Sequence, residues 1–272
     1  MRTVQLDHVA VAMPRLAEAL PFVVGELGGR YVGGGDAGAF LWRQYRYAGG
    51  GLLELLEPAG PEGGFLHRFV DHHGPGVHHV TFKVDNLEET CERAEALGFS
   101  VVGYDDSDPE WMEAFLHPKG AEGLVVQLAS VPADVGTAPE PSASPPAGDP
   151  DPGPPGVGMA GLRTGTRDPD RAHRLWCELL GGDATVVEDG WRVRWQGSPM
   201  YLSVRTAPED GPLAIELECL RPALVPRGPH PVLGVCFDTV DATTADVKGA
   251  GATRTAGEEE RDAGDVYHLE EP

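Results

Sequence analysis

The chain has 272 residues, of which 41% are hydrophobic, so it can build one large domain or two ordinary ones with real cores. Its formal net charge of −22 argues against general nucleic-acid binding, because phosphate repels an acidic surface. No apolar run approaches the roughly 20 residues that cross a bilayer, and the opening residues are too few and too polar for a signal peptide. We therefore expect a cytoplasmic protein that acts on a small molecule.

The four cysteines are scattered, and none of them forms a Cys-x-x-Cys pair. This spacing favours free thiols in a reducing compartment over a disulfide framework. In so acidic a chain, an anionic substrate would need a local positive centre, which a metal ion can provide.

The first predicted elements make a strand, a helix and three more strands. The run from His8 to Ala12 alternates as a half-buried strand does. An apolar stripe at helical spacing follows and ends at Leu27-Gly28, where glycine is the usual residue after a helix. Three strand-like runs come next, at residues 30–32, 40–47 and 52–56.

The same order recurs in the next segment of the chain. The run His79–Lys83 aligns with His8–Ala12 without a gap. Asp85 followed by Glu88 predicts a capped helix that ends at Leu97. Strand-like runs then follow at residues 100–102, 113–117 and 124–128. A short helix at 64–71 is expected to join the two copies.

Residues 131–156 are predicted to be a flexible linker. They hold nine of the 25 prolines and almost no large apolar side chain, so they cannot bury enough surface to offset their ordering entropy. They divide the chain into a domain at 1–130 and a domain at 157–272.

The C-terminal half carries weaker echoes of the repeat, at residues 168–182 and 232–247. They predict two further modules, the last one short and without its final strand. His8 aligns near Gly161 and His79 near Gly234, and Glu218 alone keeps the place of a candidate ligand. We interpret this half as a degenerate copy that serves packing, pairing or closure of a cleft.

The repeat pairs four side chains that can bind a metal. His8 and His79 hold matching positions in the first strands, and Glu54 and Gln127 do so in the last strands. If the two copies pair around a pseudo-twofold axis, all four converge. Two imidazoles, a carboxylate and an amide oxygen suit a divalent transition ion with open positions. A packed histidine is the commoner reading of either imidazole alone, and the symmetry is what favours the metal.

These motifs resemble the vicinal oxygen chelate superfamily of glyoxalases, bleomycin resistance proteins and dioxygenases, and within it most closely the methylmalonyl-CoA epimerases. The resemblance covers most of residues 4–130 through the motifs LDHVAVAMPRLAEAL, LLELLEPAGP, GPGVHHVTFKVDNLEE and FLHPKGAEGLVVQL, which occur in order. It implies an α+β fold of paired βαβββ modules, followed here by a degenerate domain of the same type. It also implies a divalent metal that stabilises an enolate-like intermediate, with cobalt, nickel, zinc, manganese and iron not distinguished. Its ligands would be His8, Glu54, His79 and Gln127.

Two departures from the epimerase pattern affect the chemistry. Gln127 stands where that family has a glutamate that is both a ligand and an acid–base group, and an amide has no useful proton affinity. The strand at 39–47, which carries the other base in the family, has no carboxylate. Gln44 and Tyr45 are its nearest polar candidates for a catalytic role, beside Gln127.

The sequence therefore predicts a metal-dependent isomerase or lyase that acts on a small carbonyl compound or an acyl-CoA thioester. A non-catalytic, resistance-type binding protein is one alternative, and the missing bases favour it. An extradiol-type dioxygenase is another, because two histidines and a glutamate are its iron ligands. A homodimer is the assembly that we consider.

Overall fold

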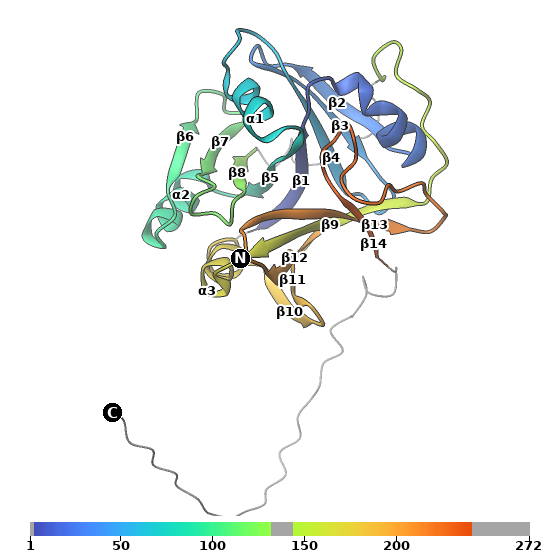
Figure 1. Cartoon of the computed structure of the whole chain (residues 1–272). Helices are drawn as coiled ribbons and strands as arrows, with labels where there is room; N and C mark the ends of the chain where they lie inside the picture. The colour runs from blue at the N-terminus through green and yellow to red at the C-terminus, as the bar shows by residue number, and fades with distance from the viewer. Residues whose placement is uncertain (1–2, 132–143, 241–272) are drawn as a thin grey trace, which may run out of the picture.

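Two mixed β-sheets with few helices form the protein in the computed structural model, which describes residues 3–131 and 144–240 (Figure 1). The first sheet has eight strands in the order β2-β3-β4-β1-β5-β8-β7-β6, and the second has six in the order β10-β11-β12-β9-β13-β14. The predicted α+β class with paired modules is confirmed.

In the first module, two short irregular helices stand where the sequence predicts a single helix. Its strands are β1 (Val4–Ala12), β2 (Arg30–Asp36), β3 (Phe40–Arg46) and β4 (Leu52–Pro58). A 3-10 turn, η1 (Leu16–Glu18), and a π-helix, η2 (Pro21–Glu26), replace the single predicted helix. Pro21 has no backbone N–H, so a regular helical ladder cannot run through it and a new helix begins there.

The second module follows the predicted order. It comprises β5 (Gly76–Val84), α2 (Leu87–Ala96), β6 (Val101–Asp105), β7 (Met112–Leu116) and β8 (Val125–Ser130). Helix α1 (Phe65–His73) joins the modules. Asn86, and not the expected Asp85, caps α2, since its side chain accepts a hydrogen bond from the Glu89 N–H at 3.0 Å.

The two modules meet along β1 and β5, which run antiparallel. The cross-strand pairs at the centre are His8 with Thr81, Val9 with Val80, and Ala10 with His79. The offset that aligns His8 with His79 also aligns Val9 with Val80, so the pairing is symmetric about Val9 and Val80. The predicted pseudo-twofold axis therefore passes between these two valines.

The sheet has one face in the main core and one face that carries polar side chains. Val9, Val11 and Phe82 lie in a large apolar cluster on the core face. The opposite face, which we call the site face, carries His8 and Glu54. At one end of the site face, α1 packs on the sheet through a smaller buried cluster. Its buried members are Ala10, Ala12, Leu56 and Leu66.

The C-terminal unit repeats the arrangement around β9 and β13. Its elements are β9 (Val157–Thr166), α3 (Pro169–His173), the π-helix η3 (Arg174–Leu179), β10 (Asp183–Val187), β11 (Gly190–Arg194), β12 (Tyr201–Thr206), β13 (Gly211–Cys219) and β14 (Phe237–Val240). Strand β13 is antiparallel to β9, and β12 is parallel to it, as β5 and β4 are to β1. Strand β14 runs parallel to β13 as β8 runs parallel to β5, so it lies at the place of the final strand that we expected to be missing. Residues 241–272 lie outside the described residues.

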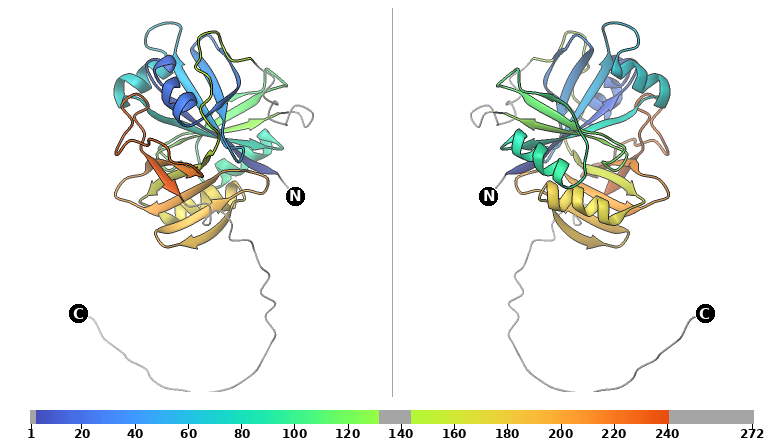
Figure 2. Two further views of the ribbon diagram at one scale, coloured as in Figure 1. Left: turned by 90° about the vertical axis from the view of Figure 1, so that its right-hand side faces the viewer. Right: turned by 90° about the vertical axis from the view of Figure 1, so that its left-hand side faces the viewer.

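The two units share one core. Phe82 of the first sheet lies 4.8 Å from Trp195 and 6.0 Å from Trp176 of the second unit, measured between ring centroids. Helix α2 and η3 lie side by side (Figure 2), and Arg93 donates to the Leu179 carbonyl at 2.7 Å. Buried apolar residues of both units form one continuous cluster.

Residues 144–156 differ from the flexible linker that their composition predicts. Asp149 accepts hydrogen bonds from Arg43 at 2.6 Å and from the Tyr45 hydroxyl at 3.3 Å. The Gly153 N–H donates to the Val24 carbonyl at 2.9 Å. These polar contacts fix a segment that has little apolar surface to bury. The rest of the predicted linker, residues 132–143, lies outside the described residues.

None of the helices in the described part of the chain is both long enough and apolar enough to span a membrane.

Candidate metal centre

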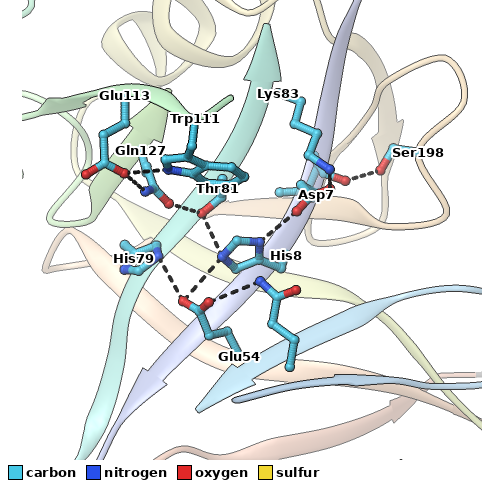
Figure 3. Close-up of polar contacts among 12 residues, drawn as sticks. Asp7, His8, Glu54, His79, Thr81, Lys83, Trp111, Glu113, Gln127 and Ser198 are labelled. Atoms are coloured by element: carbon cyan, nitrogen blue, oxygen red, sulfur yellow. Dashed lines mark hydrogen bonds and ion pairs between the residues drawn. The ribbon is translucent and has the colours of Figure 1, made fainter. Parts of the chain in front are cut away.

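Three neighbouring strands bring His8, Glu54 and His79 together on the site face (Figure 3). All three side chains are buried, and one ligand atom of each lies within 4.8 Å of the others. Glu54 Oε2 is 3.4 Å from His8 Nε2 and 3.5 Å from His79 Nε2. The arrangement presents two imidazole nitrogens and a carboxylate oxygen to one point, which is a donor set for a divalent transition ion.

Strand pairing explains why these residues meet. Ala10 of β1 faces His79 on one side and Glu54 on the other, because β1 lies between β5 and β4. His8 lies two residues before Ala10 and therefore points to the same face. Residues far apart in the sequence are thus held together by three hydrogen-bonded strands.

The Nδ1 atom of each imidazole already has a hydrogen-bond partner. His8 Nδ1 lies 2.8 Å from Asp7 Oδ2, and Asp7 Oδ1 accepts from Lys83 at 2.9 Å. His79 Nδ1 lies 2.9 Å from His78 Nδ1. Both rings therefore turn Nε2 toward Glu54. Partners of this kind fix the orientation and tautomer of metal-binding histidines.

His79 provides a direct test of whether a metal fits. Its Nε2 is buried and has no hydrogen-bond partner among the described residues. A buried polar atom without a partner costs on the order of 1–3 kcal/mol. A cation next to Glu54 would satisfy this nitrogen, so the donor set fits a divalent ion.

The charges of the site also favour a cation. Burial opposes the charged form of His8, but the Glu54 and Asp7 carboxylates outweigh it and raise the pKa of His8 to about 9. Burial and the neighbouring imidazoles lower the pKa of His79 well below its usual value. For Asp7, burial is outweighed by His8 and Lys83, which lower its pKa to about 2. The carboxylates beside His8 thus favour a positive charge on it, and a bound metal would take the place of a proton there.

Gln127, the expected fourth ligand, is connected to His8 through the Thr81 hydroxyl. Its Oε1 accepts a hydrogen bond from Thr81 Oγ1 at 2.5 Å, and Thr81 Oγ1 lies 2.9 Å from His8 Nε2. The register explains the position, because Gln127 faces Thr81 as Glu54 faces Ala10. Direct coordination by Gln127 stays a prediction and requires its amide to leave Thr81.

The two polar candidates on β3 face opposite sides. Gln44 Nε2 donates to Glu54 Oε1 at 3.1 Å and therefore orients the carboxylate. Tyr45 points away from the site: its ring packs against Tyr31, and its hydroxyl reaches Asp149. The expected catalytic role of Tyr45 does not fit this geometry, because successive strand residues alternate between faces.

Several residues of the site are absent from the sequence-based prediction. Asp7 adjoins His8 and could have been identified as its carboxylate partner. Thr81 follows from the symmetric pairing of β1 and β5, which places it opposite His8. Glu113 accepts hydrogen bonds from Gln127 Nε2 at 2.6 Å and from Trp111 Nε1 at 2.9 Å, and no local motif indicates this contact.

The equivalent point of the second sheet holds an arginine. Gly161 pairs with Glu216 as His8 pairs with Thr81, and Arg163 pairs with Ser203 as Ala10 pairs with Glu54. Arg163 Nε donates to Glu216 Oε1 at 2.9 Å, and the guanidinium also pairs with Asp238. A guanidinium thus supplies the positive charge here.

This register corrects two alignments in the C-terminal half. Glu218, which we expected at the place of Glu54, lies on β13, the equivalent of β5. Ser203 of β12 holds the place of Glu54. Ala214, and not Gly234 as expected, holds the place of His79. The local likeness of LECLRP to LLELLEP is misleading because strand pairing is set by contacts distant in sequence.

Comparisons with known proteins agree with the fold. Residues 7–115 match the family model described as the Glyoxalase/Bleomycin resistance protein/Dioxygenase superfamily. A hypothetical protein from Staphylococcus aureus is similar over 88% of this chain and 99% of its own, with a TM-score of 0.57 and 10% identity. At this identity, the likeness concerns the fold alone.

Two further solved structures are similar over about half of the chain. Methylmalonyl-CoA epimerase from Mycobacterium tuberculosis is 24% identical, with a TM-score of 0.43 over 48% of this chain and 90% of that protein. A hypothetical protein from Bacillus halodurans C-125 is 26% identical, with a TM-score of 0.44 over 47% of this chain and 95% of its own. No curated protein sequence matches the chain.

Proposed function

We propose that the chain is a metal-dependent enzyme of the glyoxalase/bleomycin resistance protein/dioxygenase superfamily, whose family model residues 7–115 match. We propose an isomerase or lyase that acts on a small carbonyl compound or an acyl-CoA thioester. The observation that supports the proposal most is the convergence of His8, Glu54 and His79, in which the buried Nε2 of His79 has no hydrogen-bond partner among the described residues. The thioester is proposed as a substrate because the sequence motifs of residues 4–130 resemble those of the epimerase family.

The proposed chemistry divides between the ion and the chain. When bound, a divalent ion supplies stabilisation of negative charge on a carbonyl oxygen of the substrate. His8, Glu54 and His79 hold the ion, and Gln127 is the proposed fourth ligand. Gln44 fixes the orientation of the Glu54 carboxylate through its 3.1 Å hydrogen bond. The ligand set is buried, which strengthens electrostatic interactions there relative to water.

Binding without turnover is the second candidate, and one observation favours it. The groups at the two positions expected to carry bases are amides, at Gln44 and Gln127, and both are engaged in hydrogen bonds. A resistance-type protein would need a pocket for its ligand and no acid–base group.

Metal content is the first test of the proposal. We expect the full chain, purified after growth with divalent metals, to hold about one ion per chain by elemental analysis. His79→Ala should lose it, because one of three ligands is removed. The matched control is His72→Ala, since His72 is exposed on α1 and is not one of the three side chains that converge. Wild-type protein without stoichiometric metal would contradict the proposal.

Activity then separates the candidates. The metal-loaded chain is incubated with methylmalonyl-CoA in deuterated water, and deuterium uptake at the α-carbon is measured. Uptake supports enolate chemistry. Tight binding of the thioester without exchange favours the binding protein, and oxygen consumption with catechols under iron(II) favours the dioxygenase alternative.

A further inference from the structure

A second carboxylate, Glu113, lies on the same side of the sheet as the ligand set. Phe115 of β7 pairs with Gln127 of β8, so both side chains point to the site face. Glu113 lies two residues before Phe115 and points the same way, because side chains of a strand alternate. Figure 3 shows Glu113 beside Gln127, on the side of His79 and Thr81.

The hydrogen bonds of Glu113 leave one of its oxygens available. Oε2 accepts both from Gln127 Nε2 at 2.6 Å and from Trp111 Nε1 at 2.9 Å. No hydrogen bond from the described residues reaches Oε1, and the side chain is only partly buried. The carboxylate is therefore held in place through one oxygen, while the other can take up a proton.

A continuous polar path connects Glu113 to the ligand set. His8 Nε2 contacts Thr81 Oγ1 at 2.9 Å, Thr81 donates to Gln127 Oε1 at 2.5 Å, and Gln127 donates to Glu113. The glutamine amide is thus fixed at both ends. Its position, and that of the carboxylate, are set relative to His8 by consecutive hydrogen bonds.

The other polar groups near the ligands are less suited to proton transfer. Gln44 and Gln127 are amides, and Tyr45 faces the opposite side of β3. His78 has its Nδ1 2.9 Å from His79 Nδ1, and its ring packs edge-on against Phe69, 4.9 Å between centroids. Glu113 combines a fixed position with an oxygen that accepts no hydrogen bond from the described residues.

We propose that Glu113 is the proton-transfer group of this site, an inference that rests on the proposed function. Its Oε1 takes a proton from the carbon next to the substrate carbonyl, and the C–H electron pair becomes the carbon–carbon double bond of the enolate. The π pair of the carbonyl moves to its oxygen. Return of the proton to carbon reverses these changes and leaves Glu113 ionised, so no oxidant or reductant is consumed. Trp111 and the Nε2 group of Gln127 position the Glu113 carboxylate through its Oε2, and the Oε1 atom of Gln127 is the part of that side chain proposed as a ligand.

The pseudo-twofold axis gives this assignment a structural context. Glu113 pairs with Ala129 on β8 as Trp42 pairs with Leu56 on β4, so Glu113 and Trp42 hold equivalent places. The first module thus provides the ligand carboxylate, Glu54, and the second provides the proton-transfer carboxylate. The proposed base therefore comes from β7 of the second module, although the equivalent strand of the first module, β3, carries no carboxylate.

Glu113→Gln tests the assignment in the metal-loaded full chain. Exchange of the methylmalonyl-CoA α-proton with deuterated water should fall by about 100-fold or more, the usual range for loss of a general base. Metal content should stay at the wild-type level, and the Kd for a thioether analogue of methylmalonyl-CoA should change less than about threefold, because the variant keeps the size of the side chain. Glu113→Asp should recover part of kcat with little change in KM.

Glu110→Gln is the matched control, because it removes a nearby exposed carboxylate that has no side-chain contact with the site. It should exchange at the wild-type rate. Wild-type exchange in Glu113→Gln overturns the assignment, and so does loss of metal or of analogue binding together with exchange, which shows a structural role. Absence of exchange in the metal-loaded wild type instead overturns the proposed function, and the assignment with it.

Discussion

At the scale of single residues, the groups behind the two imidazoles decide what the site can do. Asp7 occupies Nδ1 of His8, and His78 occupies Nδ1 of His79. Each ring can therefore offer only Nε2 to the space beside Glu54. The metal-binding capacity of the site depends on residues that would not themselves contact the ion.

Asp7→Asn tests this dependence. The variant keeps the size of the side chain but removes the charge that orients His8 and pairs with Lys83. Metal affinity, measured by competition with a chelator, should fall about 10- to 100-fold. Asp106→Asn removes an exposed charge elsewhere in the same domain and should bind metal as the wild type does. An unchanged affinity in Asp7→Asn would mean that the carboxylate has no part in holding the imidazole.

The ligand candidates could be predicted from the sequence, whereas the residues around them could not. His8, Glu54 and His79 occur at repeating positions, so alignment of the two copies identifies them. The contact of Glu113 with Gln127 depends on the register between β7 and β8, which no local pattern specifies. Gln44 and Tyr45 are the nearest polar candidates on the strand at 39–47, and which of the two faces the site is known only once the strand pairing is fixed.

At the scale of secondary-structure elements, local rules predict strands better than they predict helix starts. Strands of the first sheet follow from alternation and from glycine-rich ends. The predicted helix after β1 became η1 and η2 because Pro21 interrupts the helical ladder. The start of α2 was placed correctly to within one residue, but the capping side chain is Asn86.

Asn86→Ala measures the contribution of this cap. The variant leaves the Glu89 N–H without its side-chain acceptor, so the free energy of unfolding should fall by about 1 kcal/mol, as for other N-cap replacements. Asp85→Ala is the informative comparison, because within residues 3–131 and 144–240 the Asp85 carboxylate accepts a hydrogen bond only from the exposed Thr3 N–H. Urea denaturation should show the smaller effect for Asp85→Ala, and equal effects would contradict the assigned cap.

The strands around β9 are arranged like those around β1, but they carry an ion pair where the first sheet carries the candidate metal ligands. Glu216 is 2% exposed and shares the Arg163 guanidinium with Asp238. Ser203 also donates to Glu216, at 2.8 Å. The carboxylates are therefore balanced by a side chain of the protein, and no ion is needed to neutralise them.

Arg163→Met should destabilise the C-terminal unit. It leaves the buried Glu216 carboxylate without its cation, which costs about 3–5 kcal/mol when one partner of a buried pair is removed. Thermal unfolding followed by tryptophan fluorescence should report the change. Arg163→Met combined with Glu216→Met should recover much of the loss, because the unpaired charge is then absent. No recovery would show that the arginine acts through packing alone.

At the scale of the whole molecule, the two units are joined through a shared core and through charged contacts. Arg171 of the second unit donates to Glu122 of the first at 2.6 Å and to Asp210 at 2.7 Å. Phe82, on the core face of the first sheet, packs on two tryptophans of the second unit. The parts of the chain on the two sides of the predicted linker, residues 131–156, therefore bury surface against each other.

Phe82→Ala tests whether the two units unfold together. The substitution leaves a cavity in the shared cluster and should lower the stability by about 3–5 kcal/mol. Because the cluster is continuous, tryptophan fluorescence and metal release should report the same lowered midpoint in urea. Separate midpoints for the two signals would show that the units are energetically independent.

The most direct test of the account is to locate the ion itself. Crystals of the full chain grown with one equivalent of cobalt are examined by anomalous diffraction at the cobalt edge. One strong peak should lie at about 2.0–2.2 Å from each of Nε2 of His8, Nε2 of His79 and a carboxylate oxygen of Glu54, as in other sites with these ligands. A peak elsewhere, with these three side chains uncoordinated, would contradict it.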